Sequence, residues 1–277
     1  MTRKRALPPF TAIVGILIVG TFLILAAIGP YIAPYSESLT VGETWTEPSA
    51  EFLLGTDNLG RDILSRLIYG SRMTIGVALA CTILSFCIGS LGGLLAATAG
   101  RATDQILSRL VDVLLSIPVL IFALIVLSAF GSSLPVLITT IAFIDAPRVF
   151  RLVRSVAQNI AALEFVEAAW LRGEGLWWLM RHEILPNAVP PMLSEFGLRF
   201  CFNFLFVAGL SFLGLGIQPP NADWGGMVRE NGQAVGFGIA APIWPALAIG
   251  LMTIGINLIV DWFLSMDARP SGASAEM

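Results

Sequence analysis

Six apolar segments constrain the fold of this chain more than any other feature, because each approaches the length of a membrane span. About 20 consecutive apolar residues cross the hydrocarbon core of a bilayer as a helix. Lipid offers the backbone no hydrogen bonds, which favours helices over other structure. We therefore predict an all-α polytopic membrane protein with six transmembrane helices. The predicted spans cover residues 10–28, 74–99, 110–130, 134–149, 189–216 and 243–264.

The ends of two segments need comment. Asp145 and Pro147 interrupt the fourth segment, so we place its end near Val149. The first segment follows the basic residues Arg3, Lys4 and Arg5, as the apolar part of a signal peptide would. Its apolar run exceeds the 7–15 residues of such a peptide, which predicts an uncleaved first span.

Composition agrees with a membrane location. Charged residues make up 13% of the chain and hydrophobic residues 56%, whereas about 25% of the residues of a soluble domain are charged. The net charge of -3 argues against a nucleic-acid partner, because no basic face is available to neutralise phosphates. Membrane lipid is the expected environment.

Arginine and lysine placement predicts the orientation. Basic residues concentrate in the cytoplasmic loops of membrane proteins. With both termini in the cytoplasm, Arg61, Arg66, Arg72 and Arg229 lie outside, and Arg199 lies within the fifth span. The inside then holds Arg3, Lys4, Arg5, Arg101, Arg109, Arg148, Arg151, Arg154, Arg172, Arg181 and Arg269. This excess predicts that the loop over residues 148–187 is cytoplasmic.

The sequence excludes several catalytic sites. The only lysine is Lys4, so no G-x-x-x-x-G-K-[ST] phosphate-binding loop exists,. The only histidine, His182, stands beside Arg181 and Glu183, where a surface or helix-capping role is expected. We predict no cofactor, no metal site and no catalytic residue.

Charged and small residues within the spans allow two interpretations each. Glu195 and Arg199 are four residues apart on the fifth span, on one helix face,. They either line a translocation pathway or form a structural ion pair. Gly89, Gly93 and Ala97 give small-xxx-small spacing on the second span, which permits close helix packing. That packing lies either inside one subunit or between subunits.

Two segments are predicted to lie on the outer side. Ile63, Leu64, Leu67 and Ile68 form an apolar stripe, which predicts an amphipathic helix on the membrane surface, capped by Thr56 or Asp57,. Residues 216–225 are rich in turn formers and predict an ordered loop with an interfacial tryptophan, Trp224. We divide the chain into an N-terminal span with this external segment, 1–72, and a core domain, 73–277.

The predicted cytoplasmic loop carries a further pattern. A short helix, a glycine break and a proline stop are expected, with Leu163, Val166, Ala169 and Trp170 forming one apolar helix face. The key residues are Glu167, Ala168, Ala169, Gly173, Ile184, Leu185 and Pro186. This pattern resembles the EAA loop of permease subunits in ATP-driven (ABC) importers. In that family the loop couples the permease to a separate ATPase.

Two longer stretches extend the resemblance from Leu53 to Asp267. LLGTDNLGRDILSRLIYGSR and LSFLGLGIQPPNADWG are similar to the corresponding parts of permeases for dipeptides, oligopeptides and nickel, above all the C-type permease subunit. Trp170 departs from the pattern, because a basic residue often follows EAA in the family. The glycine- and tryptophan-rich stretch 173–178 departs as well. These differences concern the details of the ATPase contact.

The resemblance implies the type I ABC importer permease fold and a set of partners. These are two ATP-binding subunits, a second related permease subunit and an extracytoplasmic solute-binding protein in a prokaryotic plasma membrane. Alternating access would carry a peptide, with nickel or another small solute as the alternative. An ion-coupled secondary transporter would show inverted repeats, and an intramembrane enzyme would show a catalytic constellation. Neither is apparent.

Overall fold

The computed structural model describes residues 9–267. Within them the chain is helical, and no strand forms beyond two isolated bridges. The helices are α1 (Phe10–Ile32), α2 (Ile63–Thr98), α3 (Arg101–Ser116), α4 (Val119–Phe130), α5 (Leu134–Ala161), α6 (Glu164–Leu171), α7 (Leu176–Trp178), the π-helix η1 (Leu179–Ile184), α8 (Leu185–Phe212), α9 (Trp224–Glu230), the 3₁₀-helix η2 (Gly232–Phe237) and α10 (Ile243–Asp267). Arg3, Lys4, Arg5 and Arg269, which contribute to the predicted orientation, lie outside the described residues.

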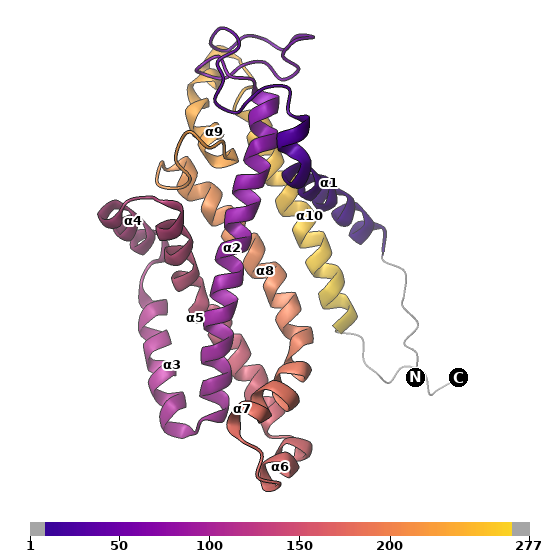
Figure 1. Ribbon diagram of the computed structural model, residues 1–277, viewed down its shortest axis with the longest axis vertical. Coiled ribbons are helices and arrows are strands. Elements are labelled where there is room, and N and C mark those ends of the chain that lie inside the picture. Colours follow the sequence, from indigo (N-terminus) through magenta and orange to yellow (C-terminus); the bar gives the residue numbers. More distant parts are fainter. Residues whose placement is uncertain (1–8, 268–277) are drawn as a thin grey trace.

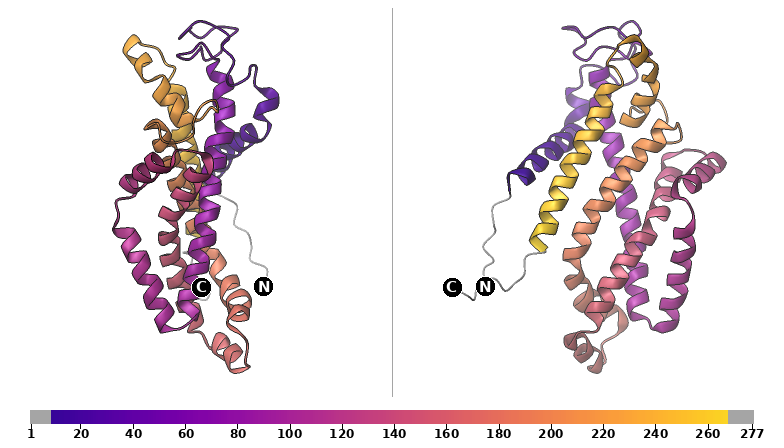
Figure 2. Two further views of the ribbon diagram at one scale, coloured as in Figure 1. Left: turned by 60° about the vertical axis from the view of Figure 1, so that its left-hand side comes forward. Right: turned by 180° about the vertical axis from the view of Figure 1, so that it is seen from behind.

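The long helices form an elongated bundle (Figure 1). α2 runs along most of its length and packs most extensively against α5, while α1 lies beside α10 and α2. The connection between α1 and α2 lies with α9 at one end of the bundle, and α6 and α7 lie at the opposite end (Figure 1). Figure 2 shows from behind that α1 and α10 lie on one side of the bundle, and α3 and α4 on the other.

Four helical stretches are long and apolar enough to cross a membrane. They are α1, α2, the continuous stretch from α7 to α8, and α10, and the bent pair of α3 and α4 could supply a fifth. α5 has 28 residues but carries Asp145, Arg148, Arg151 and Arg154. The chain is therefore a multi-pass membrane protein, and the count of six spans stays a prediction.

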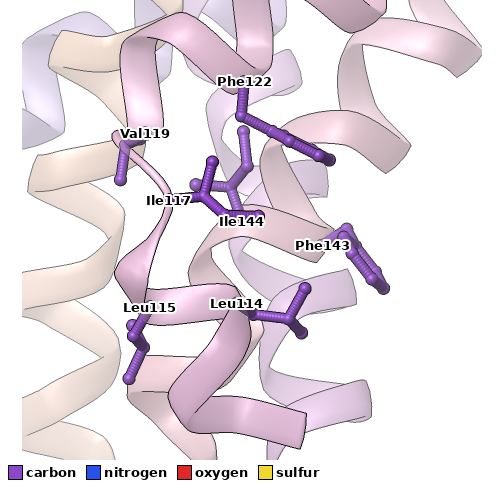
Figure 3. A pocket seen from close by; sticks show the side chains of 7 residues that line it. All are labelled: Leu114, Leu115, Ile117, Val119, Phe122, Phe143 and Ile144. Atoms are coloured by element: carbon purple, nitrogen blue, oxygen red, sulfur yellow. The ribbon is translucent and has the colours of Figure 1, made fainter.

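The predicted third span, 110–130, is wrong as a single helix. α3 and α4 meet at a bend of 85°, and Pro118 caps the start of α4. Proline has no N–H and pushes the preceding residue, Ile117, out of helical geometry. The bend encloses a small apolar pocket of about 20 Å³ against α5, between Leu114, Ile117 and Phe143 (Figure 3).

Prolines elsewhere do not end helices as predicted. α5 continues through Pro147 to Ala161, so the helix itself extends beyond Val149, where the fourth span is predicted to end. Pro186 does not stop a helix either, because it lies in the first turn of α8.

The predicted surface helix near residue 63 is the start of α2. Its N-cap is Asp62, not Thr56 or Asp57, and Asp62 Oδ2 accepts a hydrogen bond from Ser65 N at 2.8 Å. Ile63 and Ile68 are buried in the protein, not against lipid headgroups. The expectation of an amphipathic helix lying on the membrane is therefore wrong.

Trp224 is fully buried, so its predicted interfacial position is also wrong. Its ring packs edge-on against Phe22 and Phe204, and its Nε1 donates a hydrogen bond to the Leu67 carbonyl at 2.9 Å. A Cβ on Gly70 would meet this ring at 2.9 Å. Trp224, the first residue of α9, thus packs against α1, α2 and α8.

Candidate functional site

α6 is an eight-residue helix with one side in the protein core. Val166 is 5% exposed and Ala169 is fully buried. Both belong to an apolar cluster that includes Leu94 of α2 and Val153 of α5. Burial of this side stabilises a helix that is too short to be stable alone. The cluster fixes α6 to the ends of α2 and α5.

The predicted apolar face of α6 is partly wrong. Leu163 is the N-cap, in an extended conformation, and is 47% exposed, while Trp170 is 66% exposed. The helix begins only at Glu164, so the cluster receives Val166 and Ala169 alone. Glu167 and Ala168 are exposed on the other side.

Gly173 ends α6 with a left-handed turn at φ 87°. Its N–H donates to the Trp170 carbonyl at 2.9 Å, and the Glu174 N–H donates to the Ala169 carbonyl at 3.4 Å. These two bonds form a Schellman motif, which satisfies carbonyls at the end of the helix. A positive φ favours glycine because it lacks a Cβ. Gly175 has φ -75° and is not left-handed.

The π-helix η1 forms the second wall of this site. Leu179, Met180 and Ile184 are buried in the same cluster as Ala169. Leu185 is half-buried and Pro186 is exposed. Of the residues singled out in the sequence, the structure thus brings Ala169 and Ile184 together. Glu167, Ala168, Gly173 and Pro186 face outward.

An open cavity of about 390 Å³ lies beside α6. Glu167 and Trp170 line one side, and the ends of α2 and α5 contribute Thr98 and Ala161. Large apolar side chains are exposed around α6 and its C-terminal turn. They are Phe165, Trp170, Leu171, Leu176 and Trp177. Such an exposed apolar patch is typical of a protein interaction surface.

A second candidate site is an ionic cluster at the centre of the bundle. Arg199 Nε lies 2.8 Å from Glu195 Oε1, and Arg199 Nη1 lies 3.3 Å from Oδ1 of the fully buried Asp145. Arg148 Nη1 lies 3.7 Å from the same Asp145 oxygen. Sequence spacing indicated the Glu195–Arg199 pair but missed Asp145 and Arg148. An aspartate within an apolar span usually has a partner inside the bundle, and that signal was available.

Asp145 has neutral donors as well. Ser85 Oγ and Asn203 Nδ2 each donate a hydrogen bond to Asp145 Oδ2 at 3.2 Å. Asn203 Nδ2 also donates to Thr82 Oγ1 at 3.1 Å. The cluster therefore connects α2, α5 and α8.

A third polar cluster lies at the opposite end of the bundle from α6. Arg61 Nη2 and Arg66 Nη1 each donate to Glu230 Oε2 at 2.8 Å. Both arginines also donate to Asp57, which is fully buried. Asn231 accepts from Trp45 Nε1 at 3.2 Å and from Asn58 N at 3.0 Å. These contacts, the clasp, attach the connection between α1 and α2 to α9.

Asp223 caps α9 beside this clasp. Its Oδ1 accepts a hydrogen bond from Gly226 N at 3.0 Å. Burial raises the pKa of the Asp223 carboxyl to about 6, because the ionised form loses its water, and hydrogen bonds from Gly226 and Ser211 offset only part of that effect,.

Comparison with known proteins identifies similar chains. Residues 89–266 match the protein family described as binding-protein-dependent transport system inner membrane component. The dipeptide transport system permease protein DppC of Alkalihalophilus pseudofirmus is 34% identical over 251 residues, covering 90% of this chain and 83% of that protein. The di/tripeptide transport system permease protein DppC of Pseudomonas aeruginosa is 34% identical over 257 residues, covering 90% and 85%.

One further relative and one solved structure are also similar to this chain. The glutathione transport system permease protein GsiD of Pectobacterium atrosepticum is 32% identical over 260 residues, covering 93% of this chain and 86% of that protein. The crystal structure of an amino acid ABC transporter with histidines has a TM-score of 0.55 and 21% identity, covering 73% of this chain and 94% of that one. At that identity the likeness shows a shared fold.

Proposed function

This chain belongs to the family of binding-protein-dependent transport system inner membrane components, and from this premise we propose that it forms half of a peptide pathway in an ATP-driven importer. The family consists of membrane permeases. Di- or oligopeptides are the proposed solutes because the relatives are named as dipeptide and di/tripeptide permeases. Nickel or another small solute is the alternative. A second, related permease would supply the other half of the pathway.

The two-sided character of α6 is the observation that carries this proposal. Val166 and Ala169 fix the helix to the ends of α2 and α5, while Glu167, Ala168 and Trp170 remain exposed. A short helix held in this way transmits a push to the bundle without unfolding. One of two ATP-binding subunits would dock on the exposed side of α6 and the other on the partner permease, and the two subunits would hydrolyse ATP. Closure of these subunits displaces α6 and alternates the access of the pathway.

The proposed orientation follows from the position of the two ends of the bundle. α6 and its exposed apolar residues lie in the cytoplasm, and both termini lie on that side as well. The clasp and α9 lie outside, where an extracytoplasmic binding protein delivers the solute. The excess of arginine and lysine on the α6 side supports this arrangement.

Reconstitution tests the proposed function. The chain, its partner permease and two ATPases in proteoliposomes should accumulate a labelled dipeptide when loaded binding protein and ATP are present. The isolated chain should hydrolyse no ATP. Robust hydrolysis by the pure chain would contradict the pore role. Nickel uptake without peptide uptake would replace the proposed solute.

Single cysteines in a cysteine-free background test the docking surface and the orientation together. Ala168→Cys should cross-link to an ATPase subunit, and Glu51→Cys, exposed at the other end of the bundle, should react with an impermeant reagent added outside cells. The reverse pattern would overturn both the orientation and the coupling role of α6.

A further inference from the structure

Arg148 is the arginine of α5 with the weakest ion pair. Arg151 Nη2 lies 2.7 Å from Asp112 Oδ1, and Arg154 binds Asp104 through two nitrogens. Arg148 has one contact of 3.7 Å, with Asp145. Its Nη1 is buried and makes no hydrogen bond to any of the residues 9–267. A buried donor in this state is costly unless a ligand or water completes it.

Asp145 already accepts hydrogen bonds from three other donors. Ser85 and Asn203 occupy Oδ2, and Arg199 lies at 3.3 Å from Oδ1. Arg199 is in turn held by Glu195 at 2.8 Å. Arg199 therefore pairs with two carboxylates, those of Glu195 and Asp145. Arg148 has the weaker ion pair, at 3.7 Å from Asp145.

Phe202 supports both guanidinium groups. The Arg148 Cζ atom lies 4.9 Å from the centre of the ring, and the Arg199 Cζ atom lies 5.7 Å from it. Stacking on an aromatic ring holds the plane of a guanidinium group and leaves its N–H edges free to donate. The side chain of Arg148 is 31% exposed, against 19% for Arg199. Arg148 is therefore the more exposed of the two arginines that contact Phe202.

The location of these groups favours a ligand with an anionic end. Arg148 and Arg199 both contact the fully buried Asp145, and a charge-assisted hydrogen bond is stronger in such surroundings than in water. The net charge of the cluster is zero, because the two arginines balance Asp145 and Glu195. The cluster therefore does not repel a zwitterion. Guanidinium groups match carboxylates in a two-bond geometry.

We propose that Arg148, held by Phe202 and Asp145, binds the terminal carboxylate of a peptide inside the pathway. This inference rests on the proposed function. It assigns to the permease itself a recognition of the free C-terminus, additional to any selection by the binding protein. Asp145 and Phe202 act here as positioning residues.

Equilibrium binding to the assembled importer in lipid nanodiscs, without binding protein, tests the site. The probes are a dipeptide and the same dipeptide with a C-terminal amide. The wild type should bind the acid about tenfold more tightly than the amide, the worth of one charge-assisted contact. Arg148→Gln should reduce this ratio to about one, and Arg148→Lys should give an intermediate ratio because its point charge remains.

Arg151→Gln is the matched control. It removes the same charge from the same helix, at a half-exposed side chain that pairs with Asp112, and should keep the wild-type ratio. Equal binding of acid and amide by a wild-type importer that transports peptides overturns the carboxylate site alone. Loss of the partner permease from the Arg148→Gln complex overturns it as well, in favour of a subunit contact. A wild-type importer that transports no peptide overturns the proposed function instead.

Discussion

Gly89 of α2 lies so close to Val149 of α5 that a Cβ on the glycine would be 2.6 Å from the Val149 Cβ. The Ala146 carbonyl oxygen would be equally near, at 2.6 Å. One turn further on, Gly93 faces Val153 in the same way, at 3.0 Å. The small residues of α2 thus serve packing inside this chain, which is one of the two interpretations that the spacing allowed.

Gly89→Ala should destabilise the protein by about 1–3 kcal/mol, because backbone and a β-branched side chain leave no room for a methyl group. Gly76→Ala is the control on the same helix, where nothing lies within 4 Å of the added atom. That variant should be neutral or slightly stabilising, since alanine favours helix. Thermal unfolding in detergent measures the difference. Equal melting temperatures for the two variants would show that α2 and α5 separate easily.

Gly173→Asp should lower peptide uptake severalfold while the chain still inserts and accumulates. At φ 87° any other residue strains the turn that ends α6, by roughly 1–2 kcal/mol. Gly175→Asp introduces the same charge two residues later at φ -75°, where the backbone accepts any residue. Neither site has an atom within 4 Å of the added Cβ. If the two variants lose uptake equally, charge and not the turn is responsible.

Arg66→Gln should destabilise the clasp by on the order of 3 kcal/mol, because the fully buried Asp57 and the part-buried Glu230 would then share one cation, Arg61,. Arg66 is 2% exposed, and Asp57 is fully buried. Arg72→Gln changes an exposed arginine of the same helix and should have little effect,. Limited proteolysis of the connection between α1 and α2, with thermal unfolding, measures both. Wild-type protease resistance of Arg66→Gln would show that the clasp does not hold this connection.

Asp223 should make stability depend on pH. Its pKa is about 6 in the folded protein and about 3.9 when unfolded. The folded state therefore binds the proton more tightly, and stability falls as pH rises from about 4 to 6, by up to about 3 kcal/mol. Asp223→Asn keeps a capping oxygen and should remove this slope. Melting temperatures between pH 4 and 7 test it, with Glu51→Gln as the control. Parallel curves for wild type and Asp223→Asn would refute the assignment.

Helix starts were predictable where an apolar run begins abruptly. α1 begins at Phe10 and α10 at Ile243, as expected. The true start of α2 was missed, because the apolar stripe that begins at Ile63 predicted a separate amphipathic helix on the membrane surface, beside Arg61 and Arg66. Their charges are matched by Glu230, far along the chain. The bend between α3 and α4 had a local signal in Pro118 that length alone concealed.

In the candidate sites as well, features that depend on neighbouring residues in the sequence were predictable, whereas contacts between distant residues were not. The glycine at 173 and the Glu195–Arg199 spacing are local patterns, and the structure has a left-handed turn and an ion pair there. Which side of α6 is buried depends on the ends of α2 and α5, so Trp170 was misplaced. The contact of Asp145 with Arg199 joins two spans, and no spacing within either one predicts it. Partners and residue roles stay proposals.

The contact at Gly89 lies much closer to one end of α2 than to the other. Gly89 stands about 39 Å from the Ile63 end of the helix and about 14 Å from the Thr98 end, at 1.5 Å per residue. If α2 rotates as a rigid body about its contact with α5 at Gly89, its Ile63 end moves about three times as far as its Thr98 end. A push of about 2 Å beside α6 becomes a swing of about 6 Å at the clasp, in the opposite direction. The ratio between the displacements at the two ends of α2 is then set by the position of Gly89, a residue without a side chain.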